Sequence, residues 1–281
     1  MNSNRRIFHT NRPLIGMIHF PPLVGYRDFP GLDYILKKSI NEAKLLQAGG
    51  VNAIMLENNY DIPHVEFVPK EASSMMTFLT QKVCETVSLP IGISTLWNDY
   101  KTSLSICSQT RASFIRIPAF VDTVITSYGL MTAAAKKAVT LRQKLGLHRV
   151  AILADVQVKH SEMADKNKSL SQSVREAIDS GADAIIVTGK WTGDSPKIDD
   201  LIEAREAAGS FPIFIGSGAN INNLKSLLNF ADGIIVGTAL KEGESLSKEK
   251  ETNLKPFEYS IDSQKTKDFS VTFDLLVHPI A

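Results

Sequence analysis

Residues 212–241 read PIFIGSGANINNLKSLLNFADGIIVGTALK, and they contain one pattern twice. In each copy a short apolar run, typical of a buried strand, ends in a glycine turn that leads directly into sequence typical of a helix. Main-chain N–H groups are exposed at such turns, and glycine allows a phosphate to approach them closely. The pattern therefore predicts a paired phosphate site, formed by Gly216, Ser217, Gly218, Gly237 and Thr238 with Lys241 beside them.

Six similar units precede this stretch. Apolar runs typical of parallel strands occupy residues 14–18, 52–57, 91–95, 113–117, 149–155 and 183–188. Helical sequence follows them at residues 33–48, 70–87, 99–109, 130–145, 170–180 and 198–207. No two of the runs are close enough in the chain to pair as a hairpin.

Eight strands that alternate with helices close most naturally into a (β/α)8 TIM barrel, which is an α/β fold. An open, doubly wound sheet is the alternative arrangement. In a barrel the two glycine turns would follow strands seven and eight, where barrels of this class commonly bind phosphate. The predicted fold and the predicted phosphate site therefore agree with each other.

The chain divides into a barrel and a C-terminal extension. A length of 281 residues with 43% hydrophobic composition fits one large domain, and we assign residues 1–245 to it. Residues 246–281 are predicted to be a linker and an extension, since the segment at 242–255 is charged and residues 269–277 (FSVTFDLLV) fit a helix or an added strand equally well. The first twelve residues carry three arginines and no acidic residue, and we expect a short N-terminal arm.

Charge and hydropathy exclude several classes of partner. A formal net charge of +1 gives no basic surface for nucleic acid or for an anionic membrane. No apolar run approaches the roughly 20 residues that span a bilayer, so we expect a cytoplasmic protein. Cys84 and Cys107 lie on apolar faces of predicted helices and are expected to be buried thiols in a reducing compartment. The expected partners are a small phosphorylated substrate and, in a homo-oligomer, copies of the chain itself.

Polar residues follow nearly every predicted strand. In a barrel of parallel strands the carboxyl ends meet at one mouth, where the catalytic residues of such barrels lie. We expect catalytic roles for His19, Glu57, Arg116, Asp155 and Lys159. Other polar residues and loop glycines are expected to bind the substrate, namely Asn58, Asn98, Asp99, His160, Thr188, Gly189, Thr192 and Gly193.

Glu57 and His19 are the candidates for proton transfer. Glu57 ends the run AIMLE, and a carboxylate between apolar walls can acquire the raised pKa that a general acid or base requires. A salt-bridging or helix-capping acid is the structural alternative. His19 directly follows the first strand and is either a proton carrier or hydrogen-bond donor to the substrate, or a structural histidine.

Two cations complete the predicted catalytic set. Arg116 interrupts the apolar run FIRI, so its guanidinium must pair with an inward carboxylate such as Glu57 or Asp155, or with an anionic ligand. A structural pair is the preferred interpretation. Lys159, in ADVQVKH (154–160), would neutralise a phosphate or form a Schiff base, and a solvated lysine is the alternative. Because side chains alternate along a strand, this segment must bend if Asp155, Lys159 and His160 all face the mouth.

The segment VTGKWTGDSP (187–196) is typical of a loop that closes over a substrate, although a simple turn explains its glycine at 193 equally well. No cofactor is evident from the sequence. The acidic residues at the strand ends are scattered and show neither HxxxH nor DxD spacing. The sequence therefore predicts no metal site; a magnesium site assembled in space from separate strand ends stays open, although the spacing does not support it.

Ordered motifs extend over residues 13–243, namely GMIHFPPL (16–23), GGVNAIMLENNYDIP (49–63), LPIGISTLWND (89–99), FIRI (114–117), ADVQVKH (154–160), GADAIIVTGKWTG (181–193), IGSG (215–218) and ADGIIVGTALKEG (231–243). Together they resemble the BtpA family. The resemblance implies a TIM barrel of the ribulose-phosphate-binding type. The family is named for a factor in photosystem I biogenesis, so the resemblance implies a fold more directly than a reaction. Ser94 and Pro118 stand where the family usually has asparagine, which leaves room for a different substrate.

The end of the second strand, LENNYDIP (56–63), is also similar to the glutamate-bearing strand of the tryptophan synthase alpha subunit, and the glycine turns resemble its phosphate site. That likeness implies Glu57 as acid or base, with Asp155 as its partner. We therefore expect an enzyme that converts a small phosphorylated metabolite, a sugar phosphate or a nucleotide-derived compound, by isomerase or lyase chemistry. The alternatives are a non-catalytic assembly or stability factor and a metal-dependent phosphohydrolase.

Overall fold

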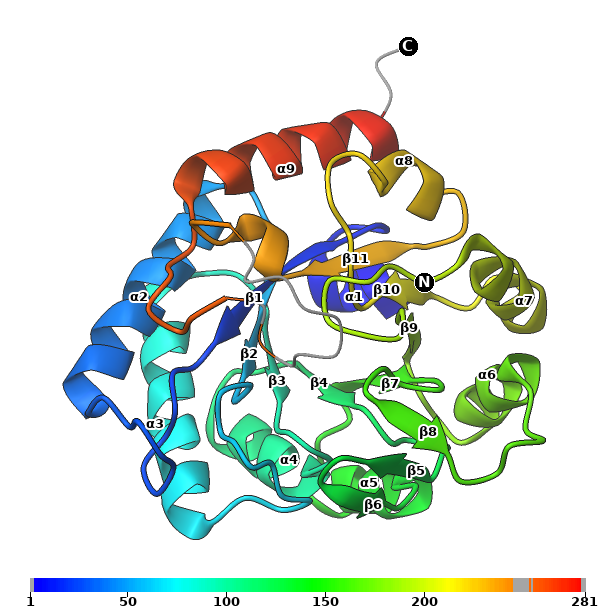
Figure 1. The fold of residues 1–281 in the computed structure, drawn as a ribbon, viewed down its shortest axis with the longest axis horizontal. Coiled ribbons are helices and arrows are strands. Elements are labelled where there is room, and N and C mark those ends of the chain that lie inside the picture. The colour runs from blue at the N-terminus through cyan, green and yellow to red at the C-terminus, as the bar shows by residue number, and fades with distance from the viewer. Residues whose placement is uncertain (1–2, 245–252, 254, 279–281) are drawn as a thin grey trace.

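A closed barrel of eight parallel strands forms the centre of the molecule (Figure 1). The computed structural model describes residues 3–244, 253 and 255–278. Around the barrel the strands follow their order in the chain, and β11 closes the ring by pairing with β1. The strands are β1 (Leu14–His19), β2 (Ala53–Glu57), β3 (Ile91–Ser94), β4 (Phe114–Ile117), β7 (Ala151–Asp155), β9 (Ala184–Val187), β10 (Ile213–Ile215) and β11 (Gly233–Val236). The predicted (β/α)8 architecture is confirmed.

Helices cover the outside of the barrel (Figure 1). The first of them, α2 (Leu32–Ala48), buries Ile35, Ala43 and Leu46 completely, as expected for a helix with one apolar face. A capping box of Ser169 and Gln172 starts α6 (Leu170–Asp179). The further helices of this outer ring are α3 (Lys70–Thr86), α4 (Tyr100–Gln109), α5 (Ala135–Lys144), α6 (Leu170–Asp179), α7 (Ile198–Ala208) and α8 (Leu224–Leu227).

The last two units are shorter than the sequence predicts. An irregular segment, residues 219–223, separates the first glycine turn from α8, and only a 3₁₀ turn, η1 (Thr238–Leu240), follows the second. The prediction that each glycine turn leads directly into an α-helix was wrong. Asparagines explain the first case, because the side chains of Asn220 and Asn223 accept hydrogen bonds from main-chain N–H groups at 3.0 and 2.8 Å and so compete with helical bonds.

A three-stranded antiparallel sheet, absent from the sequence prediction, borders the mouth of the barrel. It consists of β5 (Val124–Thr126), β6 (Gly129–Met131) and β8 (Ser161–Met163), with β5 in the middle. The eight predicted strands form no hairpin with one another, as expected, but the β5–β6 hairpin was missed, and the helix predicted at 130–145 begins only at Ala135. Each of these strands spans three residues, which is too short for a period of two to be told from a helical pattern.

Aromatic rings and glycines fill the barrel interior together. Phe114 and Phe214 point inward from β4 and β10, and a Cβ at Gly92 or Gly233 would lie only 2.1 or 2.4 Å from their rings. Phe8, at the end of α1 (Ser3–Phe8), packs on both phenylalanines with ring centroids 5.1 and 5.8 Å apart. The predicted N-terminal arm is thus a helix that plugs the amino-terminal end of the barrel.

The layer of side chains next to the carboxyl ends of the strands is polar. Interior positions recur at every second residue, and the interior cluster includes Met17, Met55, Phe114 and Leu153. The residues two places further along the chain therefore also face inward, and these are His19, Glu57, Arg116 and Asp155. Ser94 lies between Glu57 and Arg116 in register. On the other half of the barrel the same positions hold Thr188, Gly216 and Gly237.

The C-terminal extension ends in a helix that packs on the barrel. This helix, α9 (Ser263–Val277), contacts α2 and η1, so the helical interpretation of residues 269–277 is the right one (Figure 1). Asp262 caps it by accepting a hydrogen bond from the N–H of Lys265, and Phe269 and Phe273 are buried. Most of the predicted linker, residues 245–252 and 254, lies outside the described residues, and the domain boundary at 245 stays a prediction.

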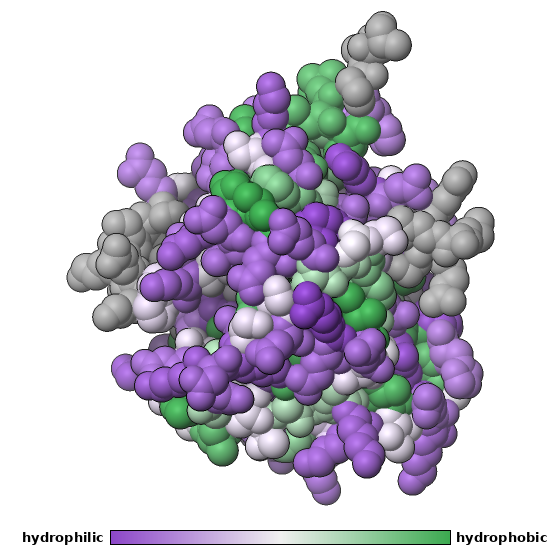
Figure 2. Space-filling model, turned by 90° about the vertical axis from the view of Figure 1, so that its right-hand side faces the viewer, coloured by the Kyte–Doolittle hydropathy of each residue, from purple (hydrophilic) through white to green (hydrophobic). Residues whose placement is uncertain are grey.

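Hydrophilic side chains predominate on the flank in Figure 2, where hydrophobic ones form small, separate patches. Within the described ranges, none of the helices has both the length and the apolar composition that crossing a membrane requires. Cys84 and Cys107 are buried and unpaired, which confirms the prediction of buried thiols. Burial raises the pKa of Cys107 to about 12.

Candidate active site

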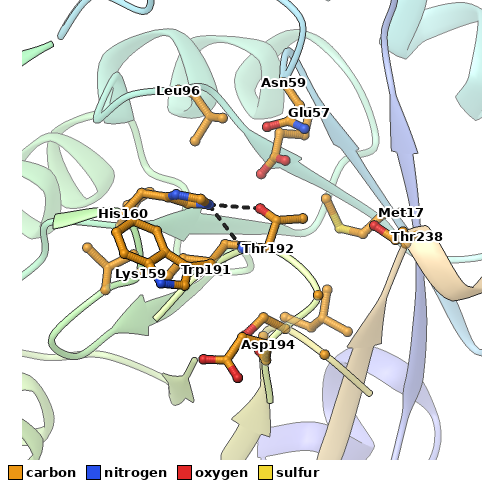
Figure 3. A pocket seen from close by; sticks show the side chains of 18 of the residues that line it. Met17, Glu57, Asn59, Leu96, Lys159, His160, Trp191, Thr192, Asp194 and Thr238 are labelled. Carbon is orange, nitrogen blue, oxygen red and sulfur yellow. Dashed lines mark hydrogen bonds between the residues drawn. The ribbon is translucent and has the colours of Figure 1, made fainter. Parts of the chain in front are cut away.

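A cavity of about 1340 Å³ lies at the carboxyl ends of the barrel strands (Figure 3). His19, Glu57 and Arg116 from the polar layer line it from below, and the loops after β4, β7, β9, β10 and β11 line its walls. Sites for small molecules usually measure about 300–1,000 Å³. The mouth is therefore large enough for a ligand that occupies two separate regions.

Glu57 lies between a histidine and an arginine. Its Oε2 is 3.5 Å from Nε2 of His19, and its Oε1 is 3.9 Å from Nη1 of Arg116. Neither carboxylate oxygen accepts a hydrogen bond of ordinary length from the described part of the chain. Figure 3 shows the carboxylate directed into open space. A substrate in the cavity can therefore reach Glu57 without displacing a protein partner.

Arg116 is held by Asp155. Nε and Nη2 of the guanidinium donate to the two carboxylate oxygens at 2.8 and 2.7 Å, and both side chains are buried. Burial alone would lower the pKa of Arg116, but the charge and hydrogen bonds of Asp155 raise it. The predicted pairing of Arg116 with an inward carboxylate is thus present. The residues that line the cavity include Arg116 and do not include Asp155.

Burial and neighbouring cations lower the pKa of His19 and of Lys159. The pKa of His19 lies well below its usual value because its ring is desolvated and because Lys241, Lys159 and Arg116 are near. The imidazole is therefore neutral near pH 7, and its contact with Glu57 is not an ion pair. Burial and the charge of Arg116 lower the pKa of Lys159 to about 8, so part of this amine is uncharged near neutral pH.

The two glycine turns form a second wall. All five of their predicted phosphate-binding residues line the cavity: Gly216, Ser217, Gly218, Gly237 and Thr238. The N–H groups of Ser217, Gly218 and Thr238 donate to no acceptor in the ranges that the structure describes. Unpaired main-chain donors beside a cavity are what an anion requires. Phosphate binding stays a prediction. The main-chain donors that it requires belong to residues that line the cavity.

Packing against β9 and the loop after it explains two of these glycines. Gly218 has φ +67°, and a Cβ there would lie 2.2 Å from the main-chain nitrogen of Ser195. At Gly216 a Cβ would lie 2.4 Å from the side chain of Ile186. Ser217 fastens the same loop, since its Oγ accepts from the N–H of Gly189 at 2.8 Å and donates to a loop carbonyl at 2.7 Å. The sequence analysis assigned the space beside these glycines to a phosphate. Part of that space is occupied by atoms of the protein itself.

The loop after β9 divides the predicted substrate-binding residues into two pairs. Thr192 and Gly193 line the cavity together with His160, whereas Thr188 and Gly189 do not. His160 Nε2 accepts a hydrogen bond from the N–H of Thr192 at 3.1 Å and lies 2.8 Å from its hydroxyl oxygen (Figure 3). Burial lowers the pKa of His160 to about 4, so this ring is neutral as well.

Three predicted substrate-binding residues, Asn58, Asn98 and Asp99, hold loops instead of lining the cavity. Asn58 Oδ1 accepts from the N–H of Leu96 at 2.7 Å, and Asp99 caps α4 by accepting from the N–H of Thr102 at 2.9 Å. Asn98 bonds to the main chain of the loop after β4. Buried side chains that bond the main chain give the same sequence pattern as ligand-binding ones, which is why the sequence did not separate them.

Lys241, predicted beside the phosphate, lies behind the cavity wall. It is 2% exposed, does not line the cavity, and donates to the hydroxyl of Tyr60 at 3.2 Å. Burial lowers its pKa to about 8. Its carbonyl accepts a hydrogen bond from Lys255 at 2.8 Å. In this structure Lys241 therefore joins the barrel to the C-terminal extension.

Ser94 and Pro118, which stand where the family usually has asparagine, lie at two different depths of the mouth. Ser94 is fully buried in the polar layer, and its hydroxyl has no hydrogen-bond partner among the described residues. Pro118 lines the cavity. Neither residue has a side-chain amide that could bind a ligand, as an asparagine would.

Sequence reasoning missed several residues that line the cavity, among them His64, Trp97 and Tyr128. Trp97 lies just past the end of β3, so its place after a strand was a usable signal. His64 comes from the loop after β2, and Tyr128 from the β5–β6 hairpin. Nothing local in the sequence indicates that these two segments reach the mouth.

A closed parallel barrel whose mouth carries a carboxylate, a neutral histidine, two cations and two glycine turns defines a TIM-barrel protein with a deep polar mouth. The chain belongs to the BtpA family, whose model matches residues 10–253, and this confirms the resemblance. An uncharacterised protein of Pyrococcus horikoshii is 37% identical over 235 residues, which cover 83% of this chain and 89% of that protein. The photosystem I biogenesis protein BtpA of Synechocystis is 37% identical over 237 residues, 83% of this chain and 82% of that protein.

Three solved structures share the fold. The N-(5′-phosphoribosyl)anthranilate isomerase of Pyrococcus furiosus has a TM-score of 0.55 at 11% identity and covers 94% of this chain and 99% of its own. A mutant tryptophan synthase alpha subunit of P. furiosus has a TM-score of 0.56 at 16% identity, with coverages of 94% and 97%. The (S)-3-O-geranylgeranylglyceryl phosphate synthase of Thermoplasma acidophilum, in complex with sn-glycerol-1-phosphate, has a TM-score of 0.54 at 15% identity, with coverages of 83% and 88%. At these identities the likeness concerns the fold alone.

Proposed function

We propose that this protein is an enzyme that converts a small phosphorylated metabolite by general acid–base chemistry, as an isomerase or a lyase. The observation that carries the proposal is the placement of Glu57, unpaired by any short hydrogen bond from the described residues, in the same cavity as the free N–H groups of the glycine turns. A phosphate on those donors would hold the carbon skeleton of a substrate over the polar layer. Isomerases and lyases suit this arrangement because they need only proton movement around an anchored anion.

The residues of the polar layer and Lys159, in the loop after β7, have separate roles in this proposal. Glu57 takes a proton from the substrate and returns it. Neutral His19 donates a hydrogen bond to a substrate oxygen or protonates it. Arg116 and Lys159 stabilise negative charge as it develops. Asp155 is a positioning residue that fixes the guanidinium, which differs from the role of proton-transfer partner that the tryptophan synthase likeness implied.

The names of two fold neighbours support the choice of a phosphorylated substrate. One is an isomerase named for a 5′-phosphoribosyl compound, and the other is a synthase in complex with sn-glycerol-1-phosphate. Both share the fold of this chain at identities of 11% and 15%. They support the class of ligand and give no argument about the reaction.

Ligand screening followed by mutagenesis tests this function. Thermal unfolding with a panel of sugar phosphates and nucleotides should find a stabilising compound, whose turnover is then measured. Glu57→Gln should lower kcat by at least about hundredfold and leave KM nearly unchanged, because a general base acts in the chemical step. Glu66→Gln, in the loop that follows β2 and outside the cavity lining, is the matched control. Turnover at the wild-type rate by Glu57→Gln would remove the assignment.

A non-catalytic assembly factor is the second candidate, because the Synechocystis relative is named as a photosystem I biogenesis protein. The same screen separates the two, since a pure scaffold would be stabilised by none of the phosphorylated compounds.

A metal-dependent phosphohydrolase is the remaining alternative, and activity that survives a chelator would be decisive against it. Within the described residues no three His, Cys, Asp or Glu side chains gather in a way that could hold a metal ion.

A further inference from the structure

Aromatic side chains line the part of the cavity that faces away from the glycine turns. We call them the aromatic lobe, and they are His64, Trp97, Tyr128, His160 and Trp191. They come from the loops after β2, β3, β4, β7 and β9, while the glycine turns follow β10 and β11. Figure 3 shows His160 and Trp191 on one side of the cavity and Thr238 on the other. The general acid–base mechanism described above uses none of these rings.

His64 is the unexplained member of the lobe. Its side chain is 3% exposed, and neither ring nitrogen has a hydrogen-bond partner among the described residues. Burial lowers its pKa to about 4, so the neutral ring carries one N–H donor and one acceptor, both unused. Leaving a buried polar group unpaired is unfavourable, by about 1–3 kcal/mol for a typical group. A ligand that pairs with His64 would remove this penalty.

Tyr128 covers His64 from the hairpin. The two ring centroids are 5.1 Å apart with the rings at 79°, so the tyrosine presents an edge-to-face contact and no hydrogen bond. Tyr128 lies in the turn between β5 and β6, within a segment whose strands are three residues long. A small movement of this turn would give a ligand access to the edge of the His64 ring.

The other rings are fixed by their neighbours. His160 packs against Trp191 with centroids 5.4 Å apart, and the N–H of Thr192 holds its Nε2. Trp97 is 6% exposed and packs with Val158 in a small apolar cluster below the hairpin. Rigid aromatic surfaces of this kind bind planar rings well, because little side-chain freedom is lost on stacking.

We propose that the aromatic lobe binds a planar nitrogen heterocycle, so that the ligand of the whole cavity is a phosphate ester carrying such a ring, as in a nucleoside monophosphate. This inference rests on the proposed function for the phosphate end of the cavity. The phosphate binds at the glycine turns, the sugar lies over Glu57, and the ring enters the lobe. The edge of a heterocycle presents donors and acceptors that match those of His64.

Size and pairing distinguish this ligand from a simple sugar phosphate. A cavity of about 1340 Å³ has room for a phosphate, a sugar and a base together. A pentose phosphate bound at the glycine turns would leave the lobe empty and both nitrogens of His64 unpaired. A ligand with a heterocycle would fill the lobe and pair with the nitrogens of His64.

Tryptophan fluorescence gives a direct readout, because the chain contains two tryptophans and both line this cavity. The probes are AMP, GMP, CMP and UMP, with ribose 5-phosphate as the matched compound without a base and the four nucleosides as compounds without a phosphate. At least one nucleoside monophosphate should quench the fluorescence and bind at least tenfold more tightly than ribose 5-phosphate, because stacking and pairing add to the phosphate contacts.

Variants test the part that His64 plays, with affinities measured by calorimetry. His64→Ala should weaken the preferred nucleoside monophosphate about tenfold and change ribose 5-phosphate binding less than twofold. His148→Ala, at an exposed histidine outside the cavity, is the control and should change neither. If His64→Ala does not fold, Trp191→Leu on the loop after β9 should show the same selective loss.

The outcomes separate this inference from the proposed function. Ribose 5-phosphate that binds as tightly as all four monophosphates would overturn the aromatic lobe as a base site and leave the phosphate site standing. Nucleosides that bind as tightly as their monophosphates would support the lobe and overturn the phosphate site. If none of the three groups of compounds binds, both proposals are wrong.

Discussion

Asp155 holds two of the three guanidinium nitrogens of Arg116 and leaves the third facing Glu57. Nε and Nη2 donate to Asp155 at 2.8 and 2.7 Å, while Nη1 is 3.9 Å from Oε1 of Glu57. The pair is inside the barrel, with side-chain exposures of 6% for Arg116 and 0% for Asp155. The guanidinium of Arg116 thus faces the cavity in a fixed orientation. Its hydrogen bonds to Asp155 compensate the cost of removing it from water.

Removing Asp155 should destabilise the protein strongly. Asp155→Ala leaves a buried guanidinium without its partner, and breaking such a pair typically lowers the free energy of unfolding by about 3–5 kcal/mol. Urea denaturation measures this change. Glu85→Ala breaks the exposed pair of Glu85 with Lys82 on α3 and should change stability little. Equal losses in the two variants would show that the fold does not need the buried pair.

Gly218→Ala should destabilise the protein more than Gly146→Ala, although both glycines have φ +67°. At Gly146 no heavy atom lies within 4 Å of an added Cβ, so the variant carries backbone strain of about 1 kcal/mol only. At Gly218 the Cβ would also lie 2.2 Å from the nitrogen of Ser195 and would displace the loop after β9. Urea unfolding of both variants measures the difference, and indistinguishable values would argue against the close packing of this loop.

The barrel was predictable because each of its strands is a nearly continuous apolar run before a polar residue or a glycine turn. In a parallel sheet covered on both faces this is the pattern that burial requires, and the count of eight selects a barrel. The hairpin of β5 and β6 was not predictable in the same way. Its strands have three residues each, and LMTAAAKKAV continues from β6 into α5 without a break in helical sequence.

Three residues of the polar layer lie at the cavity as the sequence predicts, but only some of the predicted loop residues line it, and the roles of all of them stay predictions. His19, Glu57 and Arg116 directly end their strands or interrupt them, so the period of two places them inside. For Asn58 and similar residues the sequence cannot tell a main-chain partner from a ligand, since both satisfy the same polar atoms. His64 reaches the cavity through the tertiary path of a long loop, for which no local pattern exists.

Phe8→Ala should destabilise the barrel from its amino-terminal end. Phe8 is 3% exposed and contacts the rings of Phe114 and Phe214 inside the barrel. Truncating a buried phenylalanine costs about 3–5 kcal/mol, and the terminal helix α1 can relax to reduce this somewhat. Phe78→Ala, at a position that is 39% exposed on α3, is the control and should cost much less. A similar midpoint of urea unfolding for the two variants would mean that α1 does not seal the barrel.

Lys159→Met should stabilise the protein at pH 7 and lose this advantage at high pH. Burial, with the charge of Arg116, lowers the pKa of Lys159 to about 8, from 10.5 in an unperturbed lysine. Below pH 8 the folded and unfolded chains are both protonated here, so the folded chain bears the full penalty of a buried charge. Between pH 8 and 10.5 the folded chain has released the proton and the unfolded chain retains it, so wild-type stability rises with pH.

The variant has no such charge to bury. Its free energy of unfolding should exceed that of the wild type by an amount on the order of 2 kcal/mol at pH 7, after allowance for partial exposure, and the difference should shrink as the pH approaches 10.5. Lys190→Met, at an exposed lysine of the same rim, is the control and should change stability little. Comparing the two variants also removes the contribution of Lys241, because burial lowers its pKa to about 8 and neither substituted lysine is among the causes of that shift. A Lys159→Met difference that stays flat from pH 7 to 10.5 would mean that Lys159 keeps its charge in the folded protein, and its role would then be limited to binding an anion.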